Sequence, residues 1–305
     1  MIWEPPCFVK PINNIYKMLI IRSVEELLEF VAADKAQGRS CGLVPTMGAL
    51  HAGHLSLVKR SKSDNSTTVV SVFVNPTQFN NPVDLATYPR DEEADFRLLA
   101  QEGVDAVFAP TPEEVYPEGI KAAAEYVFDL GSVAEVLEGA MRPGHFQGVA
   151  QIVSRLLRLV RPDRAYFGMK DFQQVAVVRH MVKTEKIPVE IIACPIMRAD
   201  DGFALSSRNT LLDKGQRAAA PEIHATLLKA LGLSETISVN EVRKFVTDHL
   251  NSIPGFKVEY FAIVDGETLI PVETWNESAW TVGLITVYVG EIRLIDNIIF
   301  RQPQN

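Results

Sequence analysis

The chain has 305 residues, a length that suits two domains of unequal size, and 47% of the residues are apolar and 22% charged, as in a globular protein. No apolar run approaches the roughly 20 residues that cross a bilayer, so we expect no membrane partner. The formal net charge is -8 and no basic patch offsets it. We therefore expect no nucleic-acid partner, because the surface as a whole repels polyanions.

The amino terminus and the cysteines indicate the compartment. Residues 1–17 have neither the apolar core of a secretory signal nor the Arg/Ser-rich pattern of a transit peptide. Cys7, Cys41 and Cys194 lie far apart and form no CxxC pair, which favours a reducing compartment over a disulfide framework or a zinc site. We expect residues 1–17 to be an extension and the protein to be cytoplasmic.

From residue 18 the sequence alternates between short apolar strands and amphipathic helices. The first helix begins after Ser23, which has Glu26 at the spacing of a capping box. Further strands are predicted at 40–46, 67–76, 105–110, 164–168 and 188–197, with helices at 54–62, 90–104, 144–162 and 172–186. Repeated strand-helix units with continuous apolar strands predict an α/β, Rossmann-like domain over residues 18–197, with a parallel sheet that binds ligands beyond its carboxyl ends.

The pattern changes after residue 197. Residues 206–232 and 238–252 read as helices, the second with Ser238 as its cap, and 258–270 and 279–300 read as strands around tight turns. Residues 198–305 therefore predict a smaller α+β domain.

The stretch "PTMGALHAGH", residues 45–54, predicts an anion site at the first strand-helix corner. A strand that ends at Thr46, followed by a glycine turn and a helix, leaves free backbone N–H groups at the edge of the sheet. His51 and His54 are three residues apart and offer ring N–H donors to phosphate oxygens. Gly53 between them leaves room for a base or a phosphate.

Two other interpretations of this corner remain open. In the first, His54 caps the helix and His51 is a hydrogen-bonded turn residue. In the second, the two histidines bind zinc, although no third ligand stands at a recognisable spacing.

A second polar stretch, "ALSSRN", resembles a phosphate clamp. Ser206, Ser207 and Arg208 precede an apolar-periodic helix, so hydroxyl groups, a guanidinium and a helix start converge. An ordinary serine cap with a solvated arginine explains the same residues. The HxGH motif of residues 51–54 predicts a phosphate site of its own, and the presence of both segments in one chain favours the clamp.

In chain order, "PTMGALHAGH", "SVFVNPTQFN", "YPRDEEAD", "RPGHFQGVAQIV", "YFGMKDFQQ" and "ALSSRN" resemble the motifs of the pantothenate synthetase (pantoate:β-alanine ligase) family. This family belongs to the nucleotidylyl transferase superfamily, and its HxGH and ALSSR motifs resemble the HIGH and KMSKS motifs of class I aminoacyl-tRNA synthetases. The resemblance implies that pantoate attacks Mg-ATP to give pantoyl adenylate and pyrophosphate. β-Alanine then displaces AMP to give pantothenate. A homodimer is also implied. The second domain would then be a lid with a hinge near Asp201 and Gly202, which closes over ATP and excludes water.

Carried over position by position, the resemblance implies the following ATP-binding residues: Pro45, Thr46, Met47, Gly48, Ala49, Leu50, His51, Ala52, Gly53, His54, Gly168, Met169, Lys170, Asp171, Met197, Leu205, Ser206, Ser207 and Arg208. The catalytic candidates among them are His54, His51, Lys170 and Arg208. We expect the histidines to donate hydrogen bonds to the phosphates, while the two cations neutralise the departing pyrophosphate.

The resemblance also implies the substrate and metal residues. Gln78 and Gln174 would hold the hydroxyls and carboxylate of pantoate, with Asn75 beside them, since neutral amides both donate and accept. Asp95 is the candidate magnesium ligand, although it stands in an acidic helix start that explains it equally well. Arg142 and His145 in "RPGHF" are candidates for a mobile gate or a plain helix entry.

Two other classes of function are considered. A nucleotidylyl transferase of the same fold that adenylates a phosphate-bearing acceptor would favour Arg or Lys in place of Gln78 and Gln174. A non-catalytic nucleotide-binding protein would not need the two histidines together with Lys170 and Arg208. An aminoacyl-tRNA synthetase is excluded by the acidic balance and the lack of room for an anticodon-reading domain.

Overall fold

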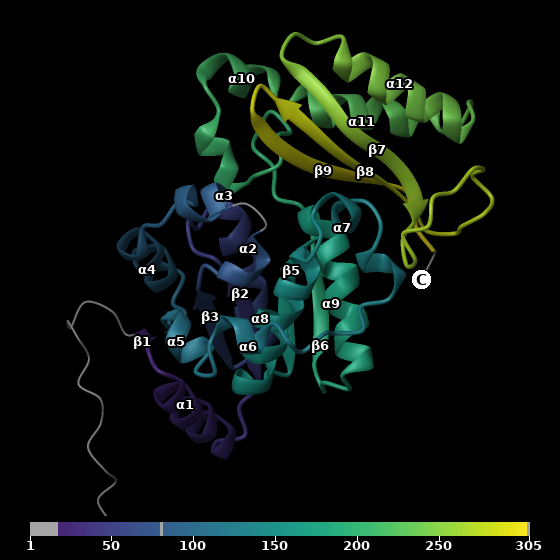
Figure 1. Cartoon of the computed structure of the whole chain (residues 1–305). Coiled ribbons are helices and arrows are strands. Elements are labelled where there is room, and N and C mark those ends of the chain that lie inside the picture. The colour runs from purple at the N-terminus through teal and green to yellow at the C-terminus, as the bar shows by residue number, and fades with distance from the viewer. Residues whose placement is uncertain (1–17, 80–81, 304–305) are drawn as a thin grey trace, which may run out of the picture.

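The amino-terminal half of the computed structural model is built on one parallel sheet (Figure 1). The model describes residues 18–79 and 82–303, so the predicted extension at 1–17, with Cys7, lies outside the described residues. The sheet has the order β1-β4-β3-β2-β5-β6 and every pairing is parallel. Its strands are β1 (Leu19–Ile21), β2 (Cys41–Thr46), β3 (Thr67–Val72), β4 (Ala106–Phe108), β5 (Arg164–Gly168) and β6 (Glu190–Cys194). The predicted Rossmann-like sheet is confirmed.

The strand order places the functional site. From β2 the chain adds β3 and β4 toward one edge, and then crosses to add β5 and β6 toward the other. The direction therefore reverses between β2 and β5. In open α/β sheets a crevice forms at this switch point, outside the carboxyl ends of the strands.

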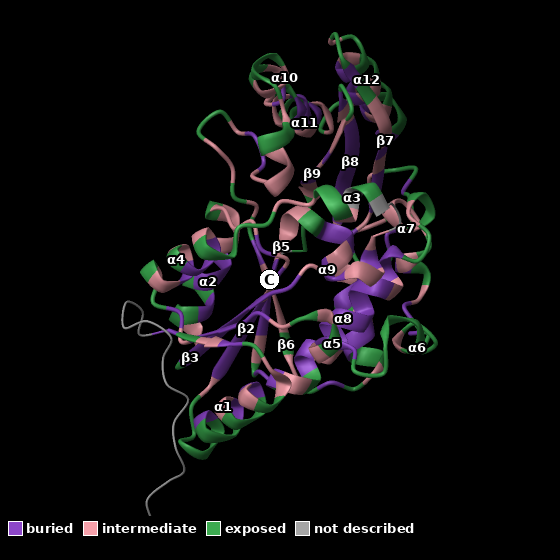
Figure 2. Ribbon diagram, turned by 60° about the vertical axis from the view of Figure 1, so that its left-hand side comes forward, coloured by how far each residue is buried: buried purple, intermediate pink, exposed green. Residues whose placement is uncertain are grey.

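Helices cover both faces of the sheet, which is why most residues of its central strands β2 and β3 are buried (Figure 2). One face packs against α1 (Val24–Ala36), α8 (His145–Val160) and α9 (Phe172–Thr184). The other face packs against α2 (Ala52–Asp64) and α4 (Glu92–Gln101). Shorter elements complete the domain: η1 (Pro76–Gln78), α3 (Pro82–Thr87), α5 (Pro112–Val115), α6 (Ile120–Ala123), η2 (Ser132–Ala134), α7 (Glu138–Met141) and η3 (Met169–Asp171). No helix in the described part of the chain is both long and apolar enough to cross a membrane.

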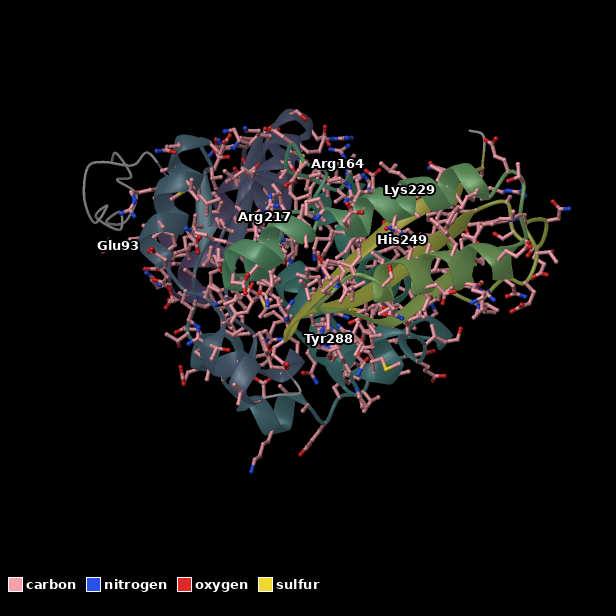
Figure 3. All side chains as sticks on the ribbon, turned by 90° about the horizontal axis from the view of Figure 1, so that it is seen from above. Glu93, Arg164, Arg217, Lys229, His249 and Tyr288 are labelled. Carbon is pink, nitrogen blue, oxygen red and sulfur yellow. The ribbon has the colours of Figure 1, made fainter. Side chains whose placement is uncertain are left out.

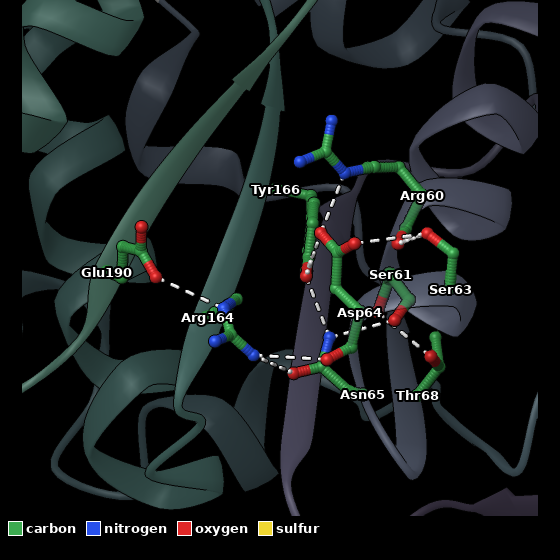
Figure 4. A network of polar contacts seen from close by, with 9 residues as sticks. All are labelled: Arg60, Ser61, Ser63, Asp64, Asn65, Thr68, Arg164, Tyr166 and Glu190. Carbon is green, nitrogen blue, oxygen red and sulfur yellow. Dashed lines mark hydrogen bonds and ion pairs between the residues drawn. The ribbon is translucent and has the colours of Figure 1, made fainter.

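A polar network fixes the far end of α2 on the sheet (Figure 4). The Asn65 side chain donates to the Tyr166 hydroxyl at 2.7 Å, and that hydroxyl donates to the Asp64 carboxylate at 3.1 Å. Arg164 donates to the Asp64 carbonyl at 3.1 Å. Because Tyr166 and Arg164 belong to β5, these contacts set the position of α2 relative to β5.

The carboxyl-terminal domain is a three-stranded antiparallel sheet under two helices, which confirms the predicted α+β class. The sheet has the order β7-β8-β9, from β7 (Phe256–Asp265), β8 (Thr281–Val289) and β9 (Ile292–Arg301). Its outer face packs against α11 (Glu222–Leu233) and α12 (Val239–Asn251). Seen from above, the domain lies across the first one, with Arg217 on α10 (Lys214–Ala219), and Lys229 and His249 on the outer helices (Figure 3).

Two predicted helix starts have the expected caps, whereas one predicted helix is divided into three. Ser23 with Glu26 and Ser238 with Glu241 both form capping boxes, as predicted. The single helix predicted over 206–232 is wrong, because it consists of η4 (Ser207–Leu211), α10 and α11. Leu212 has an extended backbone, and Asp213 caps a new helix start, so the apolar periodicity continues while the helix does not.

The inner face of the second sheet shares the core of the first domain. Val264, Val282 and Leu284 belong to the same apolar cluster as α8 and α9. Above this cluster, Glu138 of α7 receives two hydrogen bonds from Arg293 of β9, at 2.7 and 2.8 Å. The second domain is therefore docked on the first domain through both apolar and ionic contacts, and its function as a lid stays a prediction.

The position of the predicted hinge is not supported. Arg198 forms a bidentate ion pair with Asp296, at 2.7 and 2.9 Å, and Asp201 pairs with Arg217 at 2.7 Å. Arg198 and Ala204 pair as the two sides of a hairpin, whose turn residue Gly202 has φ +86°. These contacts hold the hairpin on the second domain, so the segment from 195 to 197 is left as the connection. Proline at Gly202 would break the turn rather than test a hinge, because proline fixes φ near -65°.

Candidate active site

A cavity of about 220 Å³ lies at the switch point, between the carboxyl ends of β2 and β5. Most of the predicted site residues line it. They are Pro45, Thr46, Met47, His51, Gly53, His54, Asn75, Gln78, Gly168, Lys170, Asp171, Gln174, Met197, Leu205, Ser206, Ser207 and Arg208. The predicted residues that do not line it are Gly48, Ala49, Leu50, Ala52, Met169 and Asp95. Segments separated by more than a hundred residues are thus brought to one site.

The two histidines cap the helix that they begin. Nδ1 of His51 accepts the N–H of Gly53 at 3.1 Å, and Nδ1 of His54 accepts the N–H of His51 at 3.4 Å. An Nδ1 that accepts carries no proton, so in each neutral ring the proton is assigned to Nε2. A serine or aspartate cap would satisfy the same backbone donors. Histidine does so and keeps an N–H donor for a ligand, which reconciles the capping interpretation with the phosphate-binding one.

Gly53 has a different role from the predicted one. A Cβ at this position would lie 2.7 Å from Cε1 and 2.9 Å from Nδ1 of His51. The missing side chain therefore makes room for the capping ring of His51, in place of the base or phosphate that we expected. Gly168 shows the reverse, since a Cβ there would meet no protein atom within 4 Å.

Both rings are held in the neutral form. Burial, reinforced by the charge of Lys170, lowers the pKa of His51 to about 4. Burial, with His51 and then Lys170 adding to it, lowers the pKa of His54 to about 3. At neutral pH the rings are consequently hydrogen-bond donors without charge.

We expect the NMR signals of the His51 and His54 rings in the ligand-free protein to stay unchanged from about pH 8 down to about pH 5. The unfolded chain binds protons near the ordinary value of 6.5 while the folded rings do not. Folding stability should therefore fall as the pH drops below about 6.5. Spectra of His51→Gln and His54→Gln assign the signals. A titration step of either ring above pH 6 would contradict the neutral assignment.

Asp95 supports the corner from behind. Its two carboxylate oxygens accept the N–H groups of Ala49 and Leu50, at 2.9 and 2.7 Å, and its side chain is only 2% exposed. Ala49 and Gly48 both have positive φ, of 49° and 82°. A Cβ on Gly48 would lie 2.8 Å from Asp95. The carboxylate thus stabilises a turn that few sequences adopt unaided.

Lys170 and Asp171 follow the end of β5 in the short helix η3, opposite the histidine corner. The Lys170 side chain is 16% exposed and that of Asp171 is 49% exposed. Their closest charged atoms are 3.9 Å apart. The Lys170 side chain is therefore largely shielded from water at the cavity wall, whereas a solvated surface pair would leave it exposed.

The serine-arginine segment reaches the corner from the second domain. The Ser207 hydroxyl donates to the carbonyl of Ala49 at 3.2 Å, which joins the two predicted phosphate-binding segments directly. The Ser206 hydroxyl accepts the N–H of Arg208 at 3.3 Å and caps η4. Because η4 has only five residues, the long helix that we expected to begin here does not form, and the phosphate clamp stays a prediction.

The predicted substrate amides differ in their surroundings. Asn75 is 1% exposed, and its amide donates to the Gly148 carbonyl at 2.9 Å and to Gln78 at 3.3 Å. Its carbonyl oxygen accepts from the Tyr116 hydroxyl at 2.8 Å. Asn75 therefore orients Gln78, and Gln78 and Gln174 both line the cavity.

A second cavity, of about 350 Å³, lies between the domains and shares Lys170, Gln174 and Arg208 with the first. Arg142 and His145 line it. His145 contacts the Gln78 carbonyl through Nδ1 at 2.8 Å and Arg142 through Nε2 at 3.2 Å. These two contacts assign the proton to Nδ1, because an arginine can only donate. His145 thus links Arg142 to the segment that carries Gln78.

Two residues that support this region were missed from the sequence. Glu138 lines the second cavity, and Asn297 of β9 contacts the backbone of η3. For Asn297 the available indication was a polar Asp296-Asn297 pair inside an apolar strand. Nothing in the sequence around Glu138 distinguishes it from a surface acid.

A parallel sheet with an HxGH corner, a lysine after the neighbouring strand and a serine-arginine segment defines a nucleotide-binding α/β enzyme. Comparison with known proteins makes this specific. The family model for pantoate-beta-alanine ligase matches residues 19–299. The chain is 53% identical to the pantothenate synthetase of Porphyromonas gingivalis, over 92% of this chain and 99% of the relative. It is 51% identical to that of Bacteroides fragilis, over 93% of this chain and 100% of the relative.

Solved structures agree with this result. The crystal structure of pantothenate synthetase from Thermus thermophilus aligns with a TM-score of 0.86 at 44% identity, over 93% of this chain and 100% of that one. That of pantoate-beta-alanine ligase from Francisella tularensis, complexed with beta-gamma ATP and beta-alanine, aligns with 0.76 at 35% identity, over 94% and 99%. The chain belongs to the pantoate-beta-alanine ligase family. It is a ligase that condenses pantoate with β-alanine at the expense of ATP.

Proposed function

We propose that the condensation runs in two steps at the switch-point cavity, through a pantoyl adenylate. The observation that supports this most directly is the meeting of donor groups there. Two uncharged imidazole rings, the Lys170 ammonium and the Arg208 guanidinium face one cavity. Such a set suits a polyphosphate whose negative charge increases on one side during the reaction.

In the first step a carboxylate oxygen of pantoate attacks the α-phosphorus of ATP. The bond between that phosphorus and the oxygen bridging to the β-phosphate breaks, and pyrophosphate leaves with the electron pair. An ionised carboxylate needs no general base, so His51 and His54 act as hydrogen-bond donors to the phosphates. Lys170, Arg208 and the Ser206 and Ser207 hydroxyls stabilise the charge on the departing pyrophosphate.

In the second step the free amine of β-alanine attacks the acyl carbon of the adenylate. The bond from that carbon to the phosphate oxygen breaks, AMP leaves, and the amine gives up one proton as the amide forms. Both steps require positioning more than covalent chemistry by the protein. The docked second domain serves this step by keeping water away from the adenylate.

The amides favour pantoate over a phosphate-bearing acceptor. Gln78 and Gln174 offer both donors and acceptors and no charge, which suits hydroxyls beside a carboxylate. An adenylyl transferase for a phosphate-bearing acceptor would require a cation at these positions. Asp171 would accept from the ribose hydroxyls, and the open space at Gly168 would receive the nucleoside.

Magnesium is proposed as part of the substrate, in the form of its ATP complex. The donors present do not fit a resident metal site, since the described residues include no group of three His, Cys, Asp or Glu side chains that could hold a metal ion. Both oxygens of Asp95 already accept backbone N–H groups. We therefore assign Asp95 the task of holding the corner. A homodimer and a cytoplasmic location stay predictions.

Pyrophosphate exchange tests the proposed adenylate. We expect labelled pyrophosphate to enter ATP in the presence of magnesium and pantoate without β-alanine, because the first step is then complete and reversible. The controls omit the acid or replace it with other small hydroxy acids. If AMP formed only with both substrates and no exchange occurred without β-alanine, the two-step route would be wrong. Exchange supported by phosphate-bearing acceptors instead would favour the adenylyl transferase.

A further inference from the structure

A single side chain of the second domain holds the backbone that carries Lys170. Asn297 lies in β9 and is 4% exposed. Its amide nitrogen donates to the carbonyl of Met169 at 2.8 Å and to the carbonyl of Lys170 at 3.1 Å. These are the two carbonyl groups on either side of the Lys170 Cα. Both hydrogens of the amide are thus used on the residue that the proposed mechanism needs most.

The other side of Asn297 is fixed to the second domain. Its backbone N–H donates to the Asp296 carboxylate at 2.8 Å, and that carboxylate holds Arg198 in the bidentate ion pair. Asp296 is 5% exposed, so this pair is shielded from water. Arg198 belongs to the hairpin that follows the connection between the domains. The contacts therefore run without a gap from the connection through β9 to η3.

The same strand contacts the other wall of the second cavity. Arg293 lies four residues before Asn297 in β9 and donates two hydrogen bonds to Glu138. Glu138 lies four residues before Arg142. Alternate residues of a strand face the same side. Arg293 and Asn297 hence face the first domain together, and they contact the segments of Arg142 and of Lys170.

We propose that Asn297 is a positioning residue for adenylation: by holding the Met169 and Lys170 carbonyls, it sets the direction of the Lys170 side chain when the second domain is docked. The inference rests on the proposed function for the role of Lys170. Asn297 does not contact the ligand itself, since it lines neither cavity. Docking of the second domain on the first therefore also places the Lys170 ammonium.

The sharpest variant is Asn297→Asp, because it keeps the shape and replaces the double donor with an acceptor. An ionised carboxylate would face two carbonyl oxygens at about hydrogen-bond distance, and η3 would have to move away. The charged side chains in contact with Asn297 are Arg198 and Asp296, which neutralise each other, and across the domain boundary it contacts the backbone of Met169 and Lys170. Burial and the two carbonyl oxygens favour the protonated acid. That acid can donate one of the two lost hydrogen bonds.

We expect Asn297→Asp to lower kcat for pantoate-dependent pyrophosphate exchange about 10- to 100-fold near pH 8, since a shift of about 1 Å in a catalytic group has effects of this order. As the pH falls toward 6, the ratio of variant to wild-type rate should rise, because protonation restores one donor. The attack of β-alanine on adenylate preformed on the enzyme should change far less. A merely structural residue would lower the melting temperature without this pH dependence.

Two further variants complete the test. Asn297→Ala removes both donors without adding a carboxyl group, so it should slow exchange without recovery at low pH, and it serves if Asn297→Asp fails to fold. Asn276→Asp makes the same chemical change at an exposed position of the same domain and should leave exchange unaltered. ATP affinity, measured by calorimetry without pantoate, should weaken by about tenfold for both Asn297 variants.

The two kinds of failure are separable. If the wild-type protein gave no pantoate-dependent exchange, the proposed function would fail, while the ratio of ATP affinities would still decide on Asn297. If the folded Asn297 variants bound ATP and exchanged pyrophosphate within about twofold of wild type, the positioning role would be overturned. If Asn276→Asp lost ATP affinity and pyrophosphate exchange to the same extent as the Asn297 variants, the positioning role would also be overturned.

Discussion

Replacing Lys170 with alanine is expected to lower kcat for pyrophosphate exchange about 100- to 1000-fold, the usual effect of removing one preorganised group that stabilises developing charge. Lys170 lines both cavities and is largely shielded from water. Arg208 and the two histidines would remain, so a residual rate should persist. The KM for ATP should rise less than kcat falls, because charge on the leaving pyrophosphate increases only as the bond breaks.

Lys183→Ala is the matched control for this prediction. Lys183 lies at the end of α9, the helix that follows Lys170, and it is exposed. A second measurement accompanies the kinetics, since Lys170 contributes to lowering the pKa of His51 and of His54. The pKa of both rings should rise in Lys170→Ala. A variant that kept more than about a tenth of the wild-type exchange rate would contradict the assigned role.

Replacing Glu138 with alanine is expected to destabilise the protein by about 3 kcal/mol near neutral pH, because it leaves part of a buried ion pair without its partner. One Glu138 oxygen accepts from Arg293, from the Tyr260 hydroxyl at 2.8 Å and from the Thr286 hydroxyl at 3.0 Å. The Glu138 side chain is 12% exposed. Arg293 keeps a bond to Glu259 at 2.9 Å, which limits the loss.

The pH dependence of this loss has a definite sign. Burial alone would raise the pKa of Glu138, but the hydrogen bonds and charge of Arg293, with Tyr260 and Thr286, lower it to about 2. The ordinary value is 4.5, so the stabilisation is complete above about pH 4.5 and disappears as the pH falls toward 2. Wild type and Glu138→Ala should therefore differ less in urea unfolding as the solution is acidified.

Glu93→Ala provides the control for the unfolding measurements. Glu93 also pairs with an arginine, Arg97, but its side chain is 89% exposed (Figure 3). An exposed pair of this kind contributes at most about 1 kcal/mol. If Glu138→Ala and Glu93→Ala lowered the free energy of unfolding equally, burial of the Glu138 contact would have no special effect. The two domains should separate more readily only in Glu138→Ala.

The candidate site was predictable where its chemistry is local. His51 and His54 stand in one turn of chain, and Ser206, Ser207 and Arg208 are consecutive, so motif and spacing were sufficient to place them in the cavity. Residue type makes Asp95 a candidate magnesium ligand, and its place in an acidic helix start explains it equally well. In the structure both of its oxygens accept backbone N–H groups of the corner. Spacing indicates which residue types are present, while the direction of a side chain depends on what packs around it.

The sequence by itself determined the parallel sheet, the capped helices at Ser23 and Ser238 and the HxGH corner, because periodicity, caps and turns act over a few residues. The tertiary structure alone decided that the ring of His51 needs the space at Gly53, that residues 198–204 form a hairpin held by ion pairs, and that β9 holds η3. Glu138 and Arg293 are 155 positions apart. Contacts at such separations depend on how two finished domains pack, and no local pattern records them.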